Sequence, residues 1–105
     1  MSKPTPPAPA ATRTEQDFLG TQLIPAEAYW GVHTARAVEN FPISGSTVGR
    51  WPELVRALAH VKKAAARANA KLGVLDARRS DAIQLACDDL IGGALHDQFI
   101  VDVIQ

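Results

Sequence analysis

The side chains best suited to chemistry stand close together in the sequence, at His33, Thr34 and Arg36. An arginine offers a planar fork of donors that matches a carboxylate, and a histidine adds a further donor. One interpretation of His33 and Arg36 is therefore a substrate site that binds a carboxylate. The other is a structural network on a short helix, in which Arg36 pairs with Glu39 three residues further along. We expect the network to be the more common outcome for residues of this kind.

The rest of the chain offers no catalytic or metal-binding pattern. The whole chain has three histidines, at spacings that match no metal site: His33, His60 and His96. Asp88 and Asp89 are neighbours on a predicted helix, so their carboxylates point in different directions. Cys87 lies on an apolar helix face with no His or Lys nearby, and we interpret it as a core residue rather than a nucleophile. We expect no catalytic residue, metal or cofactor in this chain.

The strongest structural signal is a long helix between Pro52 and Gly73. Proline suits the first helical position, and glycine suits the position after the last turn. Apolar residues recur between them at alternating spacings of four and three, as on a helix face that packs against a neighbour: Leu54, Leu58, Val61, Ala65, Ala68 and Leu72. The opposite face carries a basic row that we interpret as solvated: Arg56, Lys63, Arg67 and Lys71.

A second helix follows after a short link, with Asp76 or Ser80 as its N-cap. Its predicted apolar face consists of Ile83, Cys87, Leu90 and Ile91, and the pair Gly92-Gly93 ends it. Because the link is short, the two helices should pack as an antiparallel hairpin.

The flanking segments are predicted to be less regular. Residues 1–14 contain four prolines among Ala and Thr and should form a disordered tail, so the folded part would span residues 15–105. Residues 15–24 read as an irregular lead-in segment, followed by two short helical pieces that break at Gly31, the second starting near Thr34. Residues 99–104 alternate in a way that predicts an extended piece, and its abrupt end suggests a truncated chain. The fold class is thus mainly α.

Composition narrows the possible partners. The chain has 105 residues with 11 basic and 11 acidic side chains, so its formal net charge is zero. This balance does not favour nucleic acid or an anionic membrane as a partner. No apolar run is long enough to cross a membrane, and the single cysteine fits a reducing compartment, so we expect a cytoplasmic protein.

Several motifs together resemble the amino-terminal part of aspartate ammonia-lyase (aspartase), a member of the fumarase/aspartase superfamily. They run through Tyr29-Trp30-Gly31-Val32-His33-Thr34, then Glu39-Asn40-Phe41, then Val61-Lys62-Lys63, then Asp97-Gln98-Phe99, and up to Gln105. Class II fumarase is the close alternative. The residues Val32-His33 and Asp97-Gln98-Phe99 favour the aspartase branch.

The resemblance implies a homotetramer that converts L-aspartate reversibly to fumarate and ammonia without a cofactor. In that family a serine on a glycine-rich loop removes the C3 proton, and donors stabilise the resulting dianion. The resemblance places these groups beyond Gln105, so the chain would be an amino-terminal fragment that is inactive alone. A different possibility is a non-catalytic helical module that interacts with other proteins.

Overall fold

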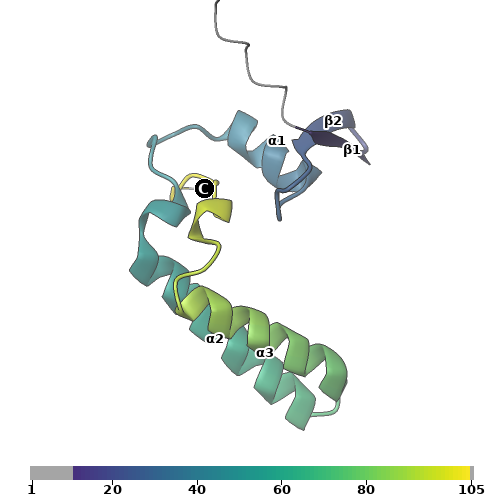
Figure 1. Cartoon of the computed structure of the whole chain (residues 1–105), viewed down its shortest axis with the longest axis vertical. Helices are drawn as coiled ribbons and strands as arrows, with labels where there is room; N and C mark the ends of the chain where they lie inside the picture. Colours follow the sequence, from purple (N-terminus) through teal and green to yellow (C-terminus); the bar gives the residue numbers. More distant parts are fainter. Residues whose placement is uncertain (1–10, 105) are drawn as a thin grey trace, which may run out of the picture. The chain divides into compact units, whose positions relative to one another are not determined.

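The computed structural model describes residues 11–104, which divide after Asn40 into two compact units. The first unit holds a two-stranded sheet and one helix, and the second holds two long helices with two short 3-10 turns (Figure 1). The predicted mainly helical fold with an antiparallel helical hairpin is confirmed.

The lead-in segment is a β-hairpin, so the prediction of an irregular segment was wrong. Strands β1 (Thr12–Asp17) and β2 (Gly20–Pro25) pair antiparallel, with Asp17 opposite Gly20. The tight turn between them depends on Gly20, whose φ of 121° favours glycine, and on the Asp17 carboxylate, which accepts a hydrogen bond from the Leu19 N–H at 2.9 Å. The predicted tail therefore loses residues 12–14 to β1, while residues 1–10 lie outside the described residues.

The next segment contains one helix where two short pieces were predicted. Residues 26–27 form a turn, residues 28–31 have no regular structure, and α1 (Val32–Asn40) begins two residues before Thr34. The Val32 N–H donates to the carboxylate of Glu15 at 2.9 Å, so a side chain from β1 caps the helix in place of the local threonine.

The two long helices end and begin as their sequence signals predict. Helix α2 (Pro52–Lys71) starts on its proline, and α3 (Ala77–Ile91) is capped by Asp76, whose carboxylate accepts from the Arg79 N–H at 2.8 Å. Each helix ends in the same arrangement, with Gly73 at φ 76° after α2 and Gly93 at φ 103° after α3. The two helices lie side by side in Figure 1.

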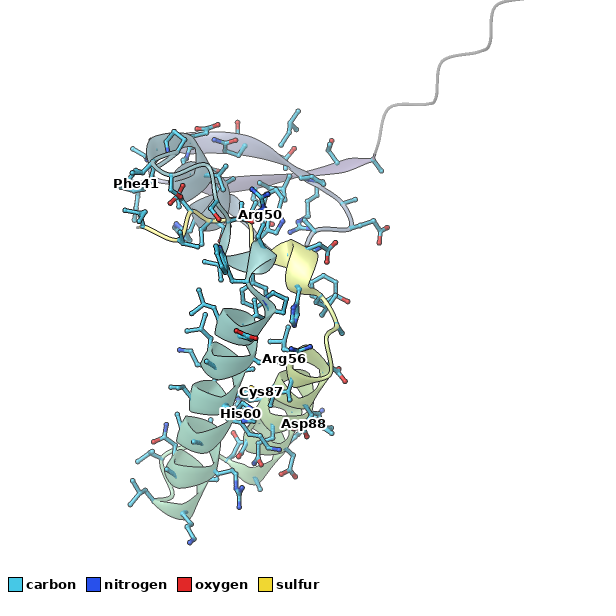
Figure 2. All side chains as sticks on the ribbon, turned by 90° about the vertical axis from the view of Figure 1, so that its left-hand side faces the viewer. Phe41, Arg50, Arg56, His60, Cys87 and Asp88 are labelled. Atoms are coloured by element: carbon cyan, nitrogen blue, oxygen red, sulfur yellow. The ribbon has the colours of Figure 1, made fainter. Side chains whose placement is uncertain are left out.

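The face of α2 that packs against α3 is not the predicted one. Its buried residues are Val55, Ala59 and Ala66, whereas the predicted apolar face is exposed, with Val61 at 65%. The basic row in turn contributes to the helix pair, because Lys63 binds Asp88 at 2.6 Å and Arg56 donates to the Ile91 carbonyl at 3.1 Å. Figure 2 shows Arg56, Cys87 and Asp88 where the helices face each other.

Small residues explain this choice of face. Ala59 and Ala66 let the backbones approach closely enough for the Ser80 hydroxyl of α3 to donate to the Ala66 carbonyl at 3.1 Å, with Ser80 only 1% exposed. The periodicity finds the larger apolar side chains of α2, but the alanines set the contact distance. Cys87 is buried at 5% exposure, as predicted.

Residues 99–104 do not form the predicted strand. A short 3-10 turn, η2 (His96–Gln98), comes before them, and among the described residues an isolated bridge joins Asp102 to Thr47. Backbone hydrogen bonds nevertheless connect this segment to η1 (Val48–Arg50), including one from Gly49 to the Phe99 carbonyl at 2.8 Å. The buried residue of this segment is the acidic Asp102. Its carboxylate accepts hydrogen bonds from backbone N–H groups, such as that of Ser44, that are not paired in a strand.

Candidate functional site

Helix α1 carries the two residues predicted to bind substrate, but it points them to different surroundings. Arg36 binds the Asp17 carboxylate at 3.1 and 3.3 Å and donates to the Gly20 carbonyl at 3.3 Å. Its side chain is only 20% exposed, so a carboxylate from the hairpin already occupies its fork. His33 is exposed on the same helix. In this structure the hairpin therefore engages Arg36, and substrate contact by His33 or Arg36 stays a prediction.

The predicted pair between Arg36 and Glu39 is absent from the described ion pairs. Glu39 instead accepts weak hydrogen bonds from the Gln22 amide of β2 at 3.3 Å. Arg36 turns toward Asp17 because the hairpin presents that carboxylate to α1 in a half-buried position, where an ion pair is screened less than on an exposed helix surface. The Arg36 hydrogen bond is the main reason that the pKa of Asp17 lies below its usual value.

Arg13 organises the connection between β2 and α1. Its guanidinium donates to four backbone carbonyls at 2.7 to 3.3 Å, those of Pro25, Ala26, Ala28 and Trp30. It also binds Glu15 at 2.7 Å, and Glu15 caps α1 through the Val32 N–H. The hydrogen bond from Arg13 is the largest cause of the lowered pKa of the Glu15 carboxyl. This network fixes residues 26–31, which have no regular secondary structure.

Asp102 is the centre of a second network, in the other unit. Its Oδ2 accepts from the Ser44 and Gly45 N–H groups at 2.8 and 3.1 Å. Its Oδ1 accepts from the Ser44 hydroxyl at 2.8 Å and from the Ile104 N–H at 2.9 Å. Four donors on one carboxylate favour its charged form, and the pKa of Asp102 is accordingly lowered, with the Ile104 N–H as the largest cause.

Neither network has the composition of a catalytic centre. The Ser44 hydroxyl donates to the Asp102 carboxylate, and among the described residues no histidine or lysine hydrogen-bonds to it as in a serine nucleophile with its base. His96 uses Nε2 on the Leu90 carbonyl at 2.8 Å, which orients the 3-10 turn that follows α3. No group of three His, Cys, Asp or Glu residues within residues 11–104 could hold a metal ion. The described helices include none long and apolar enough to cross a membrane.

A mostly apolar hollow of the second unit lies at the start of α2. It has a volume of about 340 Å³ and is lined by Trp51, Pro52, Glu53, Leu54 and Val103. Trp51 is 55% exposed, and its indole N–H donates to the Ser46 hydroxyl at 2.9 Å. With Glu53 as its one charged residue, this hollow suits an apolar side chain better than a dicarboxylate.

Sequence reasoning missed Arg13, Asp17 and Asp102, which organise the two networks. Arg13 and Asp17 belong to the alternation Arg13-Thr14-Glu15-Gln16-Asp17, which places three charged residues on one face of a strand. That alternation was a usable signal. Asp102 is different, because its partner Ser44 is 58 residues away and no local pattern links them.

Comparison with known proteins decides the family. The sequence profile of a family described as lyase matches residues 20–105. The chain belongs to this lyase family. It is 59% identical over 93 residues to a class II fumarate hydratase of Halobacterium salinarum, and 52% identical over 96 residues to an aspartate ammonia-lyase of Pseudomonas aeruginosa. These matches cover 89% and 91% of this chain.

Solved structures show the same relationship. This chain superimposes with a TM-score of 0.81 on the native form of a fumarate lyase:delta crystallin from Brucella melitensis, at 56% identity, covering 90% of this chain and 22% of that one. It spans about a fifth of the length of the curated relatives, 19% of the fumarate hydratase and 20% of the aspartate ammonia-lyase. Fumarases and aspartases are both close relatives, so the predicted superfamily is confirmed and the preference for the aspartase branch is not.

Proposed function

We propose that this chain is the amino-terminal part of an aspartate ammonia-lyase. In the complete reaction, L-aspartate loses a proton from C3 and ammonia from C2, and the electron pair of the C3–H bond becomes the double bond of fumarate. The observation that carries the proposal is identity of about 50% to aspartate ammonia-lyases from several bacteria along about nine tenths of this chain.

The role proposed for this part of the enzyme is structural. Arg13 and Arg36 are bound to carboxylates or to the backbone, and the Asp102 carboxylate is held by four donors, so each charged group of the two described networks already has partners. In a lyase of the relatives' length, the groups that hold the substrate and remove its proton would come from the part this chain lacks. His33 is the residue of this chain that we would test near substrate, because it is exposed and adds a donor for a carboxylate.

A class II fumarate hydratase is the second candidate. It is favoured by the 59% identity to the Halobacterium protein, which exceeds the 52% to the Pseudomonas aspartate ammonia-lyase. Both reactions break a bond to C2 of a four-carbon dicarboxylate after loss of a C3 proton, so one scaffold would serve either. The difference lies in the leaving group, ammonia or water.

Two chimeras separate the candidates. In each, this chain replaces the matching segment of the Pseudomonas aspartate ammonia-lyase or of the Halobacterium fumarate hydratase, and fumarate formation is followed by its ultraviolet absorbance. Each chimera is compared with its own parent under the parent's conditions. The aspartase proposal expects a larger recovered fraction of activity in the aspartase chimera.

The opposite order of recovery would replace the first candidate by the second. Loss of activity in both chimeras, with circular dichroism showing that both fold, would contradict the lyase proposal. The 105-residue chain by itself is expected to release no ammonia from L-aspartate. Release above that of a buffer control would contradict the structural role.

A further inference from the structure

Helix α2 has an apolar face that no described part of its unit covers. This apolar seam consists of Leu54, Leu58, Val61, Ala65, Ala68 and Leu72. Leu58 is 42% exposed, Val61 65% and Leu72 76%. The face turned to α3 consists of other residues, Val55, Ala59 and Ala66. A contiguous apolar strip of this length on an otherwise charged helix marks an interaction surface rather than scattered exposed residues.

The spacing of the apolar seam identifies the shape of its partner. Alternating steps of four and three residues repeat every seven, which is the pattern that packs along another α-helix. Leucines occupy both ends, while Ala65 and Ala68 occupy the middle and allow a partner helix to approach closely. At one end, Leu54 also lines the apolar hollow beside Trp51, so the seam continues into a cavity of about 340 Å³ that can take one anchoring side chain.

Charge argues against a second copy of this chain as the partner. Helix α2 carries five Lys or Arg residues and a single Glu. Lys62 and Lys71 flank the apolar seam in the helical period, and neither has an ion pair among the described residues. Two copies of α2 would bring an excess of basic side chains together, because Glu53 is the one acidic residue that each copy could set against them, whereas a helix with several acidic residues beside its apolar face would neutralise them.

We propose that the apolar seam is the docking surface for an acid-flanked amphipathic helix from the part of the lyase polypeptide that this chain does not contain. The inference rests on the proposed function, since it takes the complete protein to have the length of its relatives, of which this chain spans about a fifth. An intrachain helix also satisfies the need to cover the seam permanently, because it is present at a high effective concentration.

Photo-crosslinking in the aspartase chimera tests the docking directly. A photoreactive amino acid replaces Val61 in the seam or, as a matched control, His60, which is the adjacent exposed residue and points about 100° away around the helix. After irradiation, peptide mapping identifies what each position has contacted. Val61 is expected to crosslink, within one polypeptide, to a helix of the remaining four fifths, and His60 is expected not to.

Two results would overturn the proposal. A crosslink from Val61 to α2 of another subunit would show that a second copy covers the seam. Absence of any Val61 crosslink beyond that of the His60 control would show that solvent does. A crosslinked but inactive chimera would support docking while contradicting the proposed function, and an active chimera without the crosslink would do the reverse.

A stability comparison gives an independent readout. In the chimera, Val61→Lys is expected to lower the melting temperature by at least about 2–4 °C and His60→Lys to leave it unchanged. In the isolated chain, both changes should be neutral, because residue 61 is already exposed there. Equal effects of the two changes in the chimera would contradict the proposal.

If the chimera fails to fold, the isolated chain is probed with overlapping peptides from the rest of the parent lyase. Binding to an acidic amphipathic peptide that is lost in Val61→Lys supports the docking. Binding to none of the peptides contradicts it.

Discussion

At the scale of single residues, the carboxylates of this chain serve as backbone partners. Asp102 accepts four hydrogen bonds, three of them from backbone N–H groups, and Glu15 caps a helix from a neighbouring strand. Each carboxylate accepts hydrogen bonds from backbone N–H groups that have no partner in regular secondary structure. Their lowered pKa values follow from this binding and do not indicate a catalytic acid or base.

The pH dependence of stability follows from these shifts. The pKa values of Glu15, Asp17 and Asp102 are lowered from usual values of 4.5, 3.8 and 3.8. Below the usual pKa the unfolded chain binds more protons than the folded chain, so the free energy of unfolding should be constant above about pH 5 and fall as the pH drops through about 4 toward the folded pKa values. Urea unfolding at a series of pH values measures this.

Asp102→Asn should weaken the acid dependence and lower stability at neutral pH. The amide retains one acceptor oxygen, and its NH₂ group would face N–H donors from the 44–45 loop or from Ile104. Asp97→Asn is the matched control, because Asp97 is exposed in the preceding 3-10 turn. Identical pH profiles for the two variants would contradict the central role of Asp102.

Gly49 is required for close backbone packing. A Cβ at this position would collide with the carbonyl oxygens of His96 and Phe99, both of which are backbone atoms that cannot rotate away. Gly49→Ala should therefore lower the free energy of unfolding by about 1–3 kcal/mol. Gly92→Ala is the control, because a Cβ there makes ordinary contacts, and denaturant unfolding of both variants measures the difference. A smaller loss for Gly49→Ala than for Gly92→Ala would contradict this packing.

At the scale of elements, the two faces of α2 differ in what they contribute to this chain. Val55 is fully buried against α3 and Val61 is 65% exposed, although both are valines on the same helix. Val55→Ala should cost about 2 kcal/mol in the isolated chain and Val61→Ala close to nothing. Thermal unfolding of the two variants compares them, and an equal or greater loss for Val61→Ala would mean that the isolated chain covers the seam.

The same comparison shows how far sequence reasoning reaches. Pro52, Asp76, Gly73 and Gly93 set the helix limits through local geometry, and all of these signals are readable. Periodicity did not predict the packing face, since the leucines of α2 lie on the exposed seam, whereas Val55 and two alanines are buried. The proposed docking of a further helix would bury both faces of α2, and it would account for the strong apolar pattern on the face that this chain leaves open.

The candidate site was likewise predictable from the sequence only in part. The motifs around His33 led to the family that the profile and the solved structures confirm. They did not reveal that Arg36 is bound to Asp17, because that pair depends on a hairpin that was predicted to be irregular. The role of Asp102 was missed because Ser44 and Gly45, which supply three of its four donors, lie in a distant loop.

At the scale of the whole molecule, the two compact units have separate stabilising networks. All described partners of Arg13 lie within residues 13–30, and all those of Asp102 lie within residues 44–104. Arg13→Lys cannot keep a planar fork on four carbonyls, so it should destabilise the connection between β2 and α1 by about 1–3 kcal/mol.

Hydrogen exchange measured by mass spectrometry locates this effect. Peptides that cover residues 25–32 should lose protection in Arg13→Lys, while those in α2 and α3 should not change. Lys62→Arg, an exposed substitution on α2, is the control. Uniform loss of protection along the chain would contradict the separate networks.

Ser44 and Asp102 are in contact although they are far apart in the sequence, and this separation affects the order of folding. Contacts between α2 and α3 join residues that are near in sequence across a short turn, whereas this carboxylate must find a loop 58 residues away. Because closing a longer loop costs more entropy, the helical hairpin should form early and the Asp102 contacts only after the main kinetic barrier. Asp102→Asn should then accelerate unfolding with little change in the folding rate, and Val55→Ala should slow folding. Stopped-flow chevron plots of the two variants would show whether each contact forms before or after the main kinetic barrier.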